Sequence, residues 1–178
     1  MSALLLVFAL AGCGVPLDSA PRAIDGPQAN NSGDQVPADT GTAVVRLYLV
    51  RDGRLVRVIR RVSAARSSNE QLQDLLRGPT SAESADGLTS ALTTMDVVSM
   101  TVTNRRATVI IGERTDQAAR SDEVLAYGQI VCTLTSQGAE VGTVSFMSGG
   151  MLLAVPRADG SLADSGLTIA DYAGLLDS

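Results

Sequence analysis

The chain has 178 residues, of which 45% are hydrophobic, enough for one domain with a core and additional tails. Its net charge is -5 and all 14 cations are arginine. This balance excludes sequence-independent binding of nucleic acid and argues against a polybasic membrane patch. Histidine and lysine are absent, which removes the commonest metal ligand, the commonest neutral-pH general base, Schiff-base chemistry and a P-loop.

The N-terminal residues predict export and lipid anchoring. The apolar run from Leu4 to Ala11 has the length of a signal-peptide core and is far shorter than the roughly 20 residues that span a bilayer. It leads into Leu10-Ala11-Gly12-Cys13, which resembles a bacterial lipobox. We therefore expect residues 1–12 to be a lipoprotein signal peptide and Cys13 to carry a lipid at the outer face of the cytoplasmic membrane. The alternative is a cytosolic protein with a loose apolar tail; the basic residues that normally begin a signal peptide are expected upstream of Met1.

Residues 13–41 have the composition of a tether. The segment is rich in Pro, Gly, Ser, Asn and Asp, and it has no apolar periodicity. Such a sequence buries too little apolar surface to offset the entropy lost on ordering. We expect a disordered linker of about 28 residues with a root-mean-square span of roughly 30 Å. The alternative is an irregular arm packed on the domain.

The first part of the domain predicted for residues 42–178 contains a hairpin and a helix. Val44–Val50 and Leu55–Val62 alternate as strands, and Asp52-Gly53 between them favours a tight turn. Glu70–Arg77 is expected to be a helix with Asn69 as its N-cap and Gly78-Pro79 as its stop. A looser segment follows, with apolar points at Gly87-Leu88 and Ala91-Leu92.

The second part predicts two more hairpins and two more helices. Val97–Thr103 alternates, which places Val98, Met100 and Val102 inside, and Asn104-Arg105 turns the chain into Ala107–Ile111. The longest helix begins at Ser121 or Asp122, runs to about Ser136 before Gly138, and is apolar around most of its circumference, so we expect it deeply buried. Its Gly128 is expected to permit close approach to the sheet. The remaining elements are two strands, Val141–Met147 and Met151–Val155, and a short helix, Ile169–Leu176.

This element order indicates an α+β fold. Hairpins mixed with helices predict a single sandwich-like domain, with helices packed on one face of a mainly antiparallel mixed sheet.

The residues predict no catalytic site, no metal site and no cofactor site. Asp122 and Glu123 are explained by the positive end of the helix dipole, and Cys132 is expected to be a buried, inert thiol. Asp159-Gly160-Ser161 with Asp164 suggests a calcium loop weakly, and a solvated turn is favoured. The pairs Arg60-Arg61 and Arg105-Arg106 are expected to be solvated, with docking of an acidic partner or glycan as the alternative.

Five stretches in order resemble the GerMN domain, which is named after a spore-germination protein and also forms the N-terminal part of actinobacterial LpqB-type lipoproteins. Residues 45–49 look like its first strand, Leu72 to Pro79 look like its "L-x-x-L-L-x-G-P" helix end, and residues 87–92 match its "G-L-x-S-x-L" loop. Residues 126–135 match its "Q-I-V-x-T-L-T" helix, and 167–172 its closing motif. The motif residues are Tyr48, Leu76, Gly78, Pro79, Gly87, Leu88, Gln129, Thr133, Asp171 and Tyr172.

The resemblance implies a non-catalytic envelope module that mediates protein contacts, and the motif residues are expected to be structural, with Gly78 ending a helix and Gln129 bonding backbone. We expect the membrane, through Cys13, and an envelope protein as partners. An exposed apolar patch or an unpaired sheet edge would support this function. The alternatives are a glycan- or peptidoglycan-binding module, which needs aromatic stacking surfaces, and a hydrolase with a pocket lined by Asp122, Glu123 or Asp171.

Overall fold

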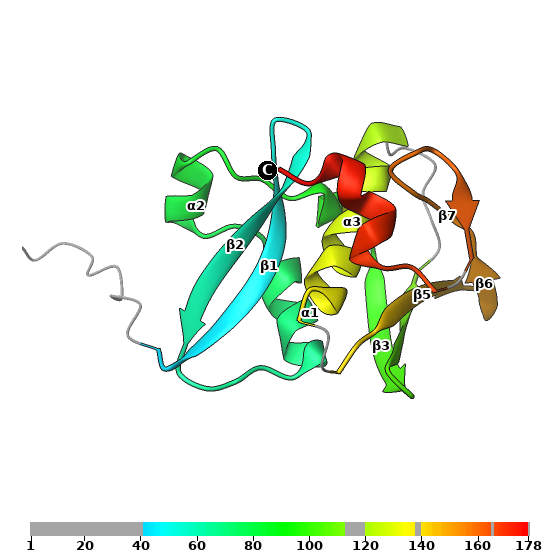
Figure 1. Ribbon diagram of the computed structural model, residues 1–178, viewed down its shortest axis with the longest axis horizontal. Coiled ribbons are helices and arrows are strands. Elements are labelled where there is room, and N and C mark those ends of the chain that lie inside the picture. The colour runs from blue at the N-terminus through cyan, green and yellow to red at the C-terminus, as the bar shows by residue number, and fades with distance from the viewer. Residues whose placement is uncertain (1–40, 113–119, 138–139, 165, 178) are drawn as a thin grey trace, which may run out of the picture. The chain divides into compact units, whose positions relative to one another are not determined.

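The computed structural model describes residues 41–112, 120–137, 140–164 and 166–177 (Figure 1). The predicted signal peptide and nearly all of the predicted tether lie outside these ranges, as does Gly138, the expected end of the long helix. All described elements belong to the unit Pro37–Ser178.

The first hairpin has the predicted form. Strand β1, Ala43–Arg51, pairs antiparallel with β2, Arg54–Val62, in unbroken register. Asp52 and Gly53 both have positive φ, which is the conformation that a two-residue turn with the twist of a hairpin requires. The turn sequence and the alternating strands therefore specified this element together.

Two helices follow the hairpin, and each begins with a capping box. Helix α1, Ser68–Leu76, is capped by Ser67 and not by Asn69 as predicted, because Ser67 has Glu70 three residues later to return the bond. Helix α2, Ser81–Ala85, lies in the segment expected to be loose, and its cap is the Thr80–Glu83 box. The cap pattern was present in the sequence at both places.

The second hairpin corrects the predicted burial of β3. After the short 3₁₀ helix η1, Ala91–Thr94, strand β3, Val97–Thr103, pairs with β4, Arg106–Ile111. The register shifts between Val97 and Ser99, so Val98 is an extra residue and its side chain is 61% exposed. Val102, near the strand end, is 38% exposed, and Met100 alone of the three predicted core residues of β3 is buried.

Helix α3, Arg120–Thr135, is buried as predicted and lies between two sheets. It contacts β1 on one side and β5, Thr143–Ser148, on the other (Figure 1). The ring of Tyr127 meets that of Phe146 on β5 edge-on, with centroids 4.8 Å apart. At Gly128 a Cβ would lie 2.8 Å from Cδ1 of Leu55 on β2 and 2.9 Å from Cδ1 of Tyr172, which confirms the expected close approach.

The α+β class and the mainly antiparallel pairing are confirmed, but the strands of the described part form separate sheets. One sheet is the β1–β2 hairpin, and a second has the order β3-β4-β5-β6, in which β4 and β5 are parallel. The predicted strand Met151–Val155 divides into β6, Met151–Leu153, and β7, Val155–Pro156, which pairs with β8, Leu162–Ala163. The last predicted helix is a 3₁₀ helix, η2, Ile169–Leu175.

Candidate functional site

Two motif side chains from α3 form hydrogen bonds along the edge of β1 that does not pair with β2. Thr133 accepts a hydrogen bond from the Tyr48 N–H at 2.9 Å, and the Gln129 amide donates to the Tyr48 carbonyl at 2.9 Å. Gln129 also accepts from the Ala91 N–H at 2.7 Å, so one buried amide joins β1 to η1. Buried backbone groups need such partners, and a strand edge needs cover, so both side chains have a structural task.

Two further residues complete the seal on either side of Tyr48. Gln71 on α1 donates to the Arg46 carbonyl at 2.8 Å and to the Thr133 carbonyl at 3.0 Å. Thr89 exchanges two backbone hydrogen bonds with Val50. The β1 edge is thus occupied from Arg46 to Val50 by helix side chains and one bridge, and it offers no pairing site to another chain.

The closing motif residues are also bonded within the domain. Tyr172 is fully buried, and its hydroxyl donates to the Pro156 carbonyl at 3.0 Å. Asp171 accepts from the Thr168 N–H at 2.8 Å and lies 3.0 Å from Nε of Arg157. These contacts fix η2 against β7 and the residue that follows it.

Four of the five remaining motif residues, Leu76, Gly78, Pro79 and Leu88, line a hollow of about 410 Å³ between α1, α2 and η1, here called the motif groove. Gly78 has a φ of 76°, which ends α1, and Gly87 has a φ of 80° after α2. The lining residues are Leu76, Arg77, Gly78, Pro79, Ser84, Leu88, Thr89, Ser90, Leu92 and Thr93. The groove has an apolar floor with a hydroxyl-bearing rim.

Arg60 supports the motif groove from β2, and it is not solvated as the sequence predicted. Its guanidinium forms two bonds to the Glu83 carboxylate, at 2.6 and 2.8 Å, and a third to the Gly78 carbonyl at 2.8 Å. Burial alone would raise the pKa of Glu83, but the Arg60 and Thr80 bonds outweigh it and hold that pKa below its usual value. A bidentate ion pair therefore joins β2 to α2, and the bond to Gly78 ties both to the end of α1.

The titratable residues singled out from the sequence do not assemble into a reactive site. Cys132 is buried, as predicted, and burial raises the pKa of its thiol to about 12, which disfavours the reactive thiolate. Asp122 and Glu123 lie in the first turn of α3, as predicted. A second hollow, of about 360 Å³, contains Asp171 and Asp159 but neither of the α3 carboxylates.

The weak calcium-loop pattern has the geometry of a turn. Asp159 accepts hydrogen bonds from the Ser161 N–H and hydroxyl, which lower the pKa of its carboxyl. Within the described ranges, no three Cys, Asp or Glu side chains gather as metal ligands would. No helix in those ranges is long and apolar enough to cross a bilayer.

The family described as Germane, sporulation and spore germination, matches residues 25–153, which is most of the chain. The chain belongs to this family. Its β1 edge, the helix α3 that covers this edge, and its motif groove lie within the matched range, whereas Asp171 and Tyr172 lie beyond it.

Solved GerMN domains share the fold. The first GerMN domain of the sporulation protein GerM from Bacillus subtilis is 21% identical, with a TM-score of 0.56 over 71% of this chain and 98% of that one. The tandem GerMN domains of the same protein are 19% identical, with a TM-score of 0.48, and the match covers 69% of this chain and 44% of that one. This chain therefore spans less than half of the tandem structure. No curated protein matches it.

Within this GerMN domain, the sequence did not predict the contacts of three residues that build the site. Gln71, Arg60 and Thr89 act through contacts with residues far along the chain, at separations from 14 to 62 residues. Glu83 carried a usable signal, because Thr80-Ser81-Ala82-Glu83 has the spacing of a capping box. Gln71, Arg60 and Thr89 carried none, since a Gln on a helix, an Arg on a strand and a Thr in a connecting segment are ordinarily solvated.

Proposed function

We propose that this GerMN-family protein is a non-catalytic lipoprotein that is anchored outside the cytoplasm through a lipid on Cys13 and mediates contacts with another envelope protein. The anchoring is supported by the apolar run from Leu4 to Ala11 and by the small residues before Cys13. The family is one of sporulation and germination domains, not a known enzyme family.

The observation that carries the protein-contact role is the free edge of β3. On one side β3 pairs with β4, and on its other side no described residue hydrogen-bonds to its backbone. Its sequence, VVSMTVT, contains no charge and no proline, the residues that usually blunt a free edge. The bulge at Val98 twists one end, and Ser99–Thr103 remains regular.

The free edge of β3 differs from the edge of β1, which the domain covers. The domain covers the β1 edge with Gln71, Gln129 and Thr133, and it places four arginines along β2. The β3 edge has neither device among the described residues. Such an edge suits strand addition, in which an extended partner segment supplies the missing backbone bonds.

The glycan-binding alternative finds no stacking surface in the described part. Its four aromatic residues, Tyr48, Tyr127, Phe146 and Tyr172, are all buried. The hydrolase alternative needs acidic groups free to react in one pocket, whereas Asp171 is bonded to Thr168 and Arg157 and lies apart from Asp122 and Glu123. The free β3 edge therefore favours the protein-contact role.

Crosslinking in intact cells tests this role. The lipidated chain would be crosslinked, purified and analysed by mass spectrometry, alongside Thr101→Lys on the β3 edge and Ala85→Lys on the exposed surface of α2. We expect a reproducible partner that Thr101→Lys loses and Ala85→Lys keeps, because an edge lysine opposes strand pairing. Equal crosslinking of both variants, or no partner for the wild type, contradicts the role.

The anchoring is tested separately by mass spectrometry of the mature N-terminus and by membrane fractionation. We expect the mature chain to begin at a diacylglyceryl-modified Cys13 and to remain with the membrane. A Cys13→Ser variant is expected to be released or to keep its leader. An unmodified Cys13 in the mature protein overturns the anchoring.

A further inference from the structure

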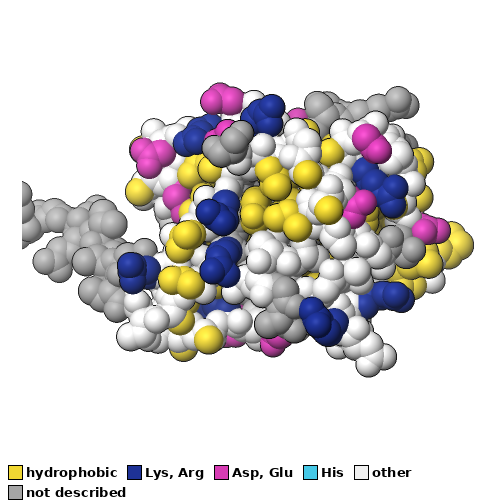
Figure 2. Space-filling model, viewed as in Figure 1, with side chains coloured by type: hydrophobic (Ala, Val, Ile, Leu, Met, Phe, Trp, Pro, Cys, Tyr) yellow, Lys and Arg dark blue, Asp and Glu magenta, His cyan; other side chains and the backbone are white. Residues whose placement is uncertain are grey.

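The β1–β2 hairpin concentrates positive charge in an acidic chain. Between Ala43 and Val62 there are six arginines and one aspartate, a net charge of +5, whereas the whole chain carries -5. The chain as a whole has more acidic than basic residues, and this overall balance conceals the local positive charge. The net charge alone therefore argued against a basic membrane patch. Figure 2 shows arginine and hydrophobic side chains side by side over this hairpin.

The cross-strand register arranges these residues in a regular pattern. Three alternate pairs share one side of the hairpin, and each combines an arginine with an apolar or aromatic residue. This set, called the arginine face, consists of the pairs Val44–Arg61, Arg46–Ile59 and Tyr48–Arg57. In two of the pairs the residue opposite the arginine is an exposed aliphatic side chain, Val44 or Ile59, so charge and hydrophobic surface alternate over this part of the face.

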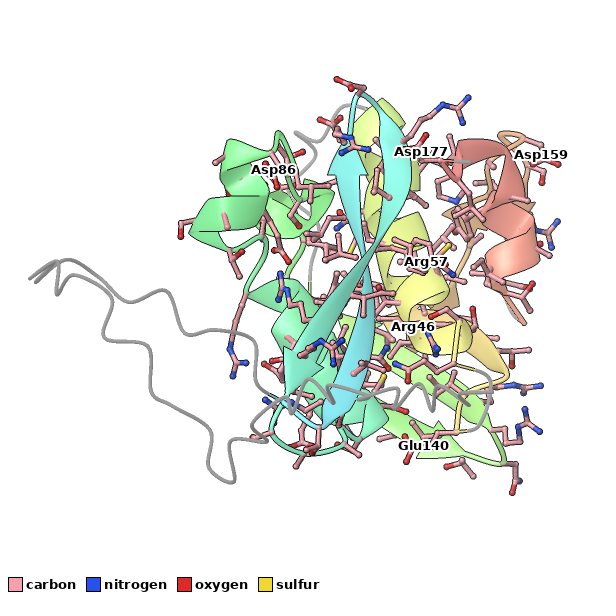
Figure 3. The ribbon with its side chains drawn as sticks, turned by 60° about the vertical axis from the view of Figure 1, so that its left-hand side comes forward. Arg46, Arg57, Asp86, Glu140, Asp159 and Asp177 are labelled. Carbon is pink, nitrogen blue, oxygen red and sulfur yellow. The ribbon has the colours of Figure 1, made fainter. Side chains whose placement is uncertain are left out.

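The arginine face is accessible except at Tyr48, which is buried. Arg46 and Arg57 lie on this hairpin (Figure 3), and neither forms an ion pair with a described residue. Ile59 is 55% exposed and Val44 is 44% exposed beside them. Burial raises the pKa of Tyr48, and the positive charges of Arg57 and Arg46 partly offset this rise, so both guanidiniums lie within electrostatic reach of its hydroxyl.

The described chain enters the β1–β2 hairpin at one end of this face. The chain enters β1 at Gly41, whose Cα lies so close to Val62 that a Cβ there would be 2.2 Å from the Val62 carbonyl oxygen. The open end of the arginine face, Val44–Arg61, is therefore the part of the face nearest to the residue where the predicted tether ends. A tether fixed at Cys13 would deliver this end to the bilayer.

We propose that the arginine face docks on the anionic phospholipid surface of the membrane and orients the domain there. Guanidiniums bind lipid phosphates, while the aliphatic side chains of Val44 and Ile59 enter the acyl boundary below them, a division that suits interleaved cationic and apolar side chains. A second copy is disfavoured because two arginine faces repel each other. This inference takes its geometry from the proposed anchoring, and it leaves the β3 edge free for a protein partner.

Vesicle co-sedimentation tests the proposal without the lipid. The probe is the chain from residue 13 with Cys13→Ser, which retains the whole unit Pro37–Ser178. It is mixed with vesicles of phosphatidylcholine alone or of equal parts phosphatidylglycerol and phosphatidylcholine. Each arginine near an anionic surface contributes roughly fivefold to partitioning. We expect binding to the anionic vesicles that Arg46→Gln/Arg57→Gln/Arg61→Gln reduces about a hundredfold.

The matched control is Arg77→Gln/Arg105→Gln/Arg106→Gln, which removes the same charge outside the β1–β2 hairpin. This variant is expected to bind the vesicles within about threefold of the unsubstituted probe, because charges farther than a Debye length from the surface are screened. Circular dichroism checks that both variants fold. Equal loss in the two variants, equal binding to both vesicle types, or capture by immobilised polyglutamate without vesicle binding overturns the proposal, the last in favour of an acidic protein.

The outcome is independent of the proposed function. Vesicle binding needs neither the lipid on Cys13 nor a partner on β3, so its failure leaves the crosslinking result unaffected. Failure of the crosslinking experiment likewise leaves the vesicle result standing.

Discussion

Replacing Gln129 with leucine removes the hydrogen bonds at the centre of the domain while keeping a similar side-chain volume. The wild-type amide satisfies the Ala91 N–H at 2.7 Å and the Tyr48 carbonyl at 2.9 Å. A buried group left without its partner costs about 1–3 kcal/mol. Because Ala91 is half-buried, water can replace part of its bond, and we expect a total loss of about 2–4 kcal/mol. That is a large share of the about 5–15 kcal/mol that stabilises a typical domain.

The assay is urea unfolding followed by far-UV circular dichroism, since the chain has no tryptophan to serve as a fluorescent probe. The matched control is Gln73→Leu on the exposed side of α1, which should change the free energy of unfolding by less than about 0.5 kcal/mol. A loss at Gln129 no larger than that of the control would refute the reasoning, because the β1 edge would then not depend on this amide.

A second substitution at the same position separates bond loss from volume. In Gln129→Glu the carboxylate can accept from Ala91 but cannot donate to Tyr48, whereas the protonated carboxyl can do both. Burial favours the neutral form, so the folded-state pKa of the introduced carboxyl is expected above the unfolded value of about 4.3. The stability of this variant should therefore rise as pH falls from about 7 toward 5. A flat pH dependence relative to wild type would contradict the assignment.

Two further predictions concern packing and charge. Gly128→Ala should lower the free energy of unfolding by about 1–3 kcal/mol in spite of a better helix propensity, because the new Cβ would overlap Leu55 and Tyr172. Adding Leu55→Val should recover part of this loss. An unchanged melting temperature of Gly128→Ala would count against the close contact. The pKa of Glu83 is lower in the folded than in the unfolded state, so its ionised carboxylate stabilises the fold. This stabilisation is fully present above the unfolded pKa of about 4.3 and is lost as pH falls through the lower folded pKa. In denaturant titrations the difference between wild type and Glu83→Gln should therefore shrink between about pH 5 and pH 3, and a difference that stays constant would show that the Arg60 pair is not its source.

Elements with strong local signals were predictable. The first hairpin needed only alternating strands and an Asp-Gly turn, and the buried helix was evident from its apolar circumference. The boundaries of both lie within a few residues of those predicted. Helix α2 was missed because its five residues include no buried side chain, so it has no apolar periodicity, although its capping box is in the sequence.

Non-local effects account for the other differences. Alternation placed Val98 inside β3, but the extra residue at the bulge reverses its side, and alternation cannot reveal a bulge. Arg60 alternates with apolar residues as a solvated arginine would, yet it is bound to Glu83, because α2 folds back over β2. Both errors arose from applying a local period where tertiary contacts decide.

By itself, the sequence determined the fold class, the strong hairpin and helix signals, the absence of histidine and lysine chemistry, and the resemblance that the family match confirmed. The tertiary structure decided which edges are covered and which charges are exposed. It joined Gln129 and Thr133 to Tyr48, left the β3 edge uncovered by any described residue, and aligned arginines of two strands on one face. The physical reason is that local propensities depend on neighbours within a few residues, whereas edges and charged faces depend on strand register and on contacts between distant segments.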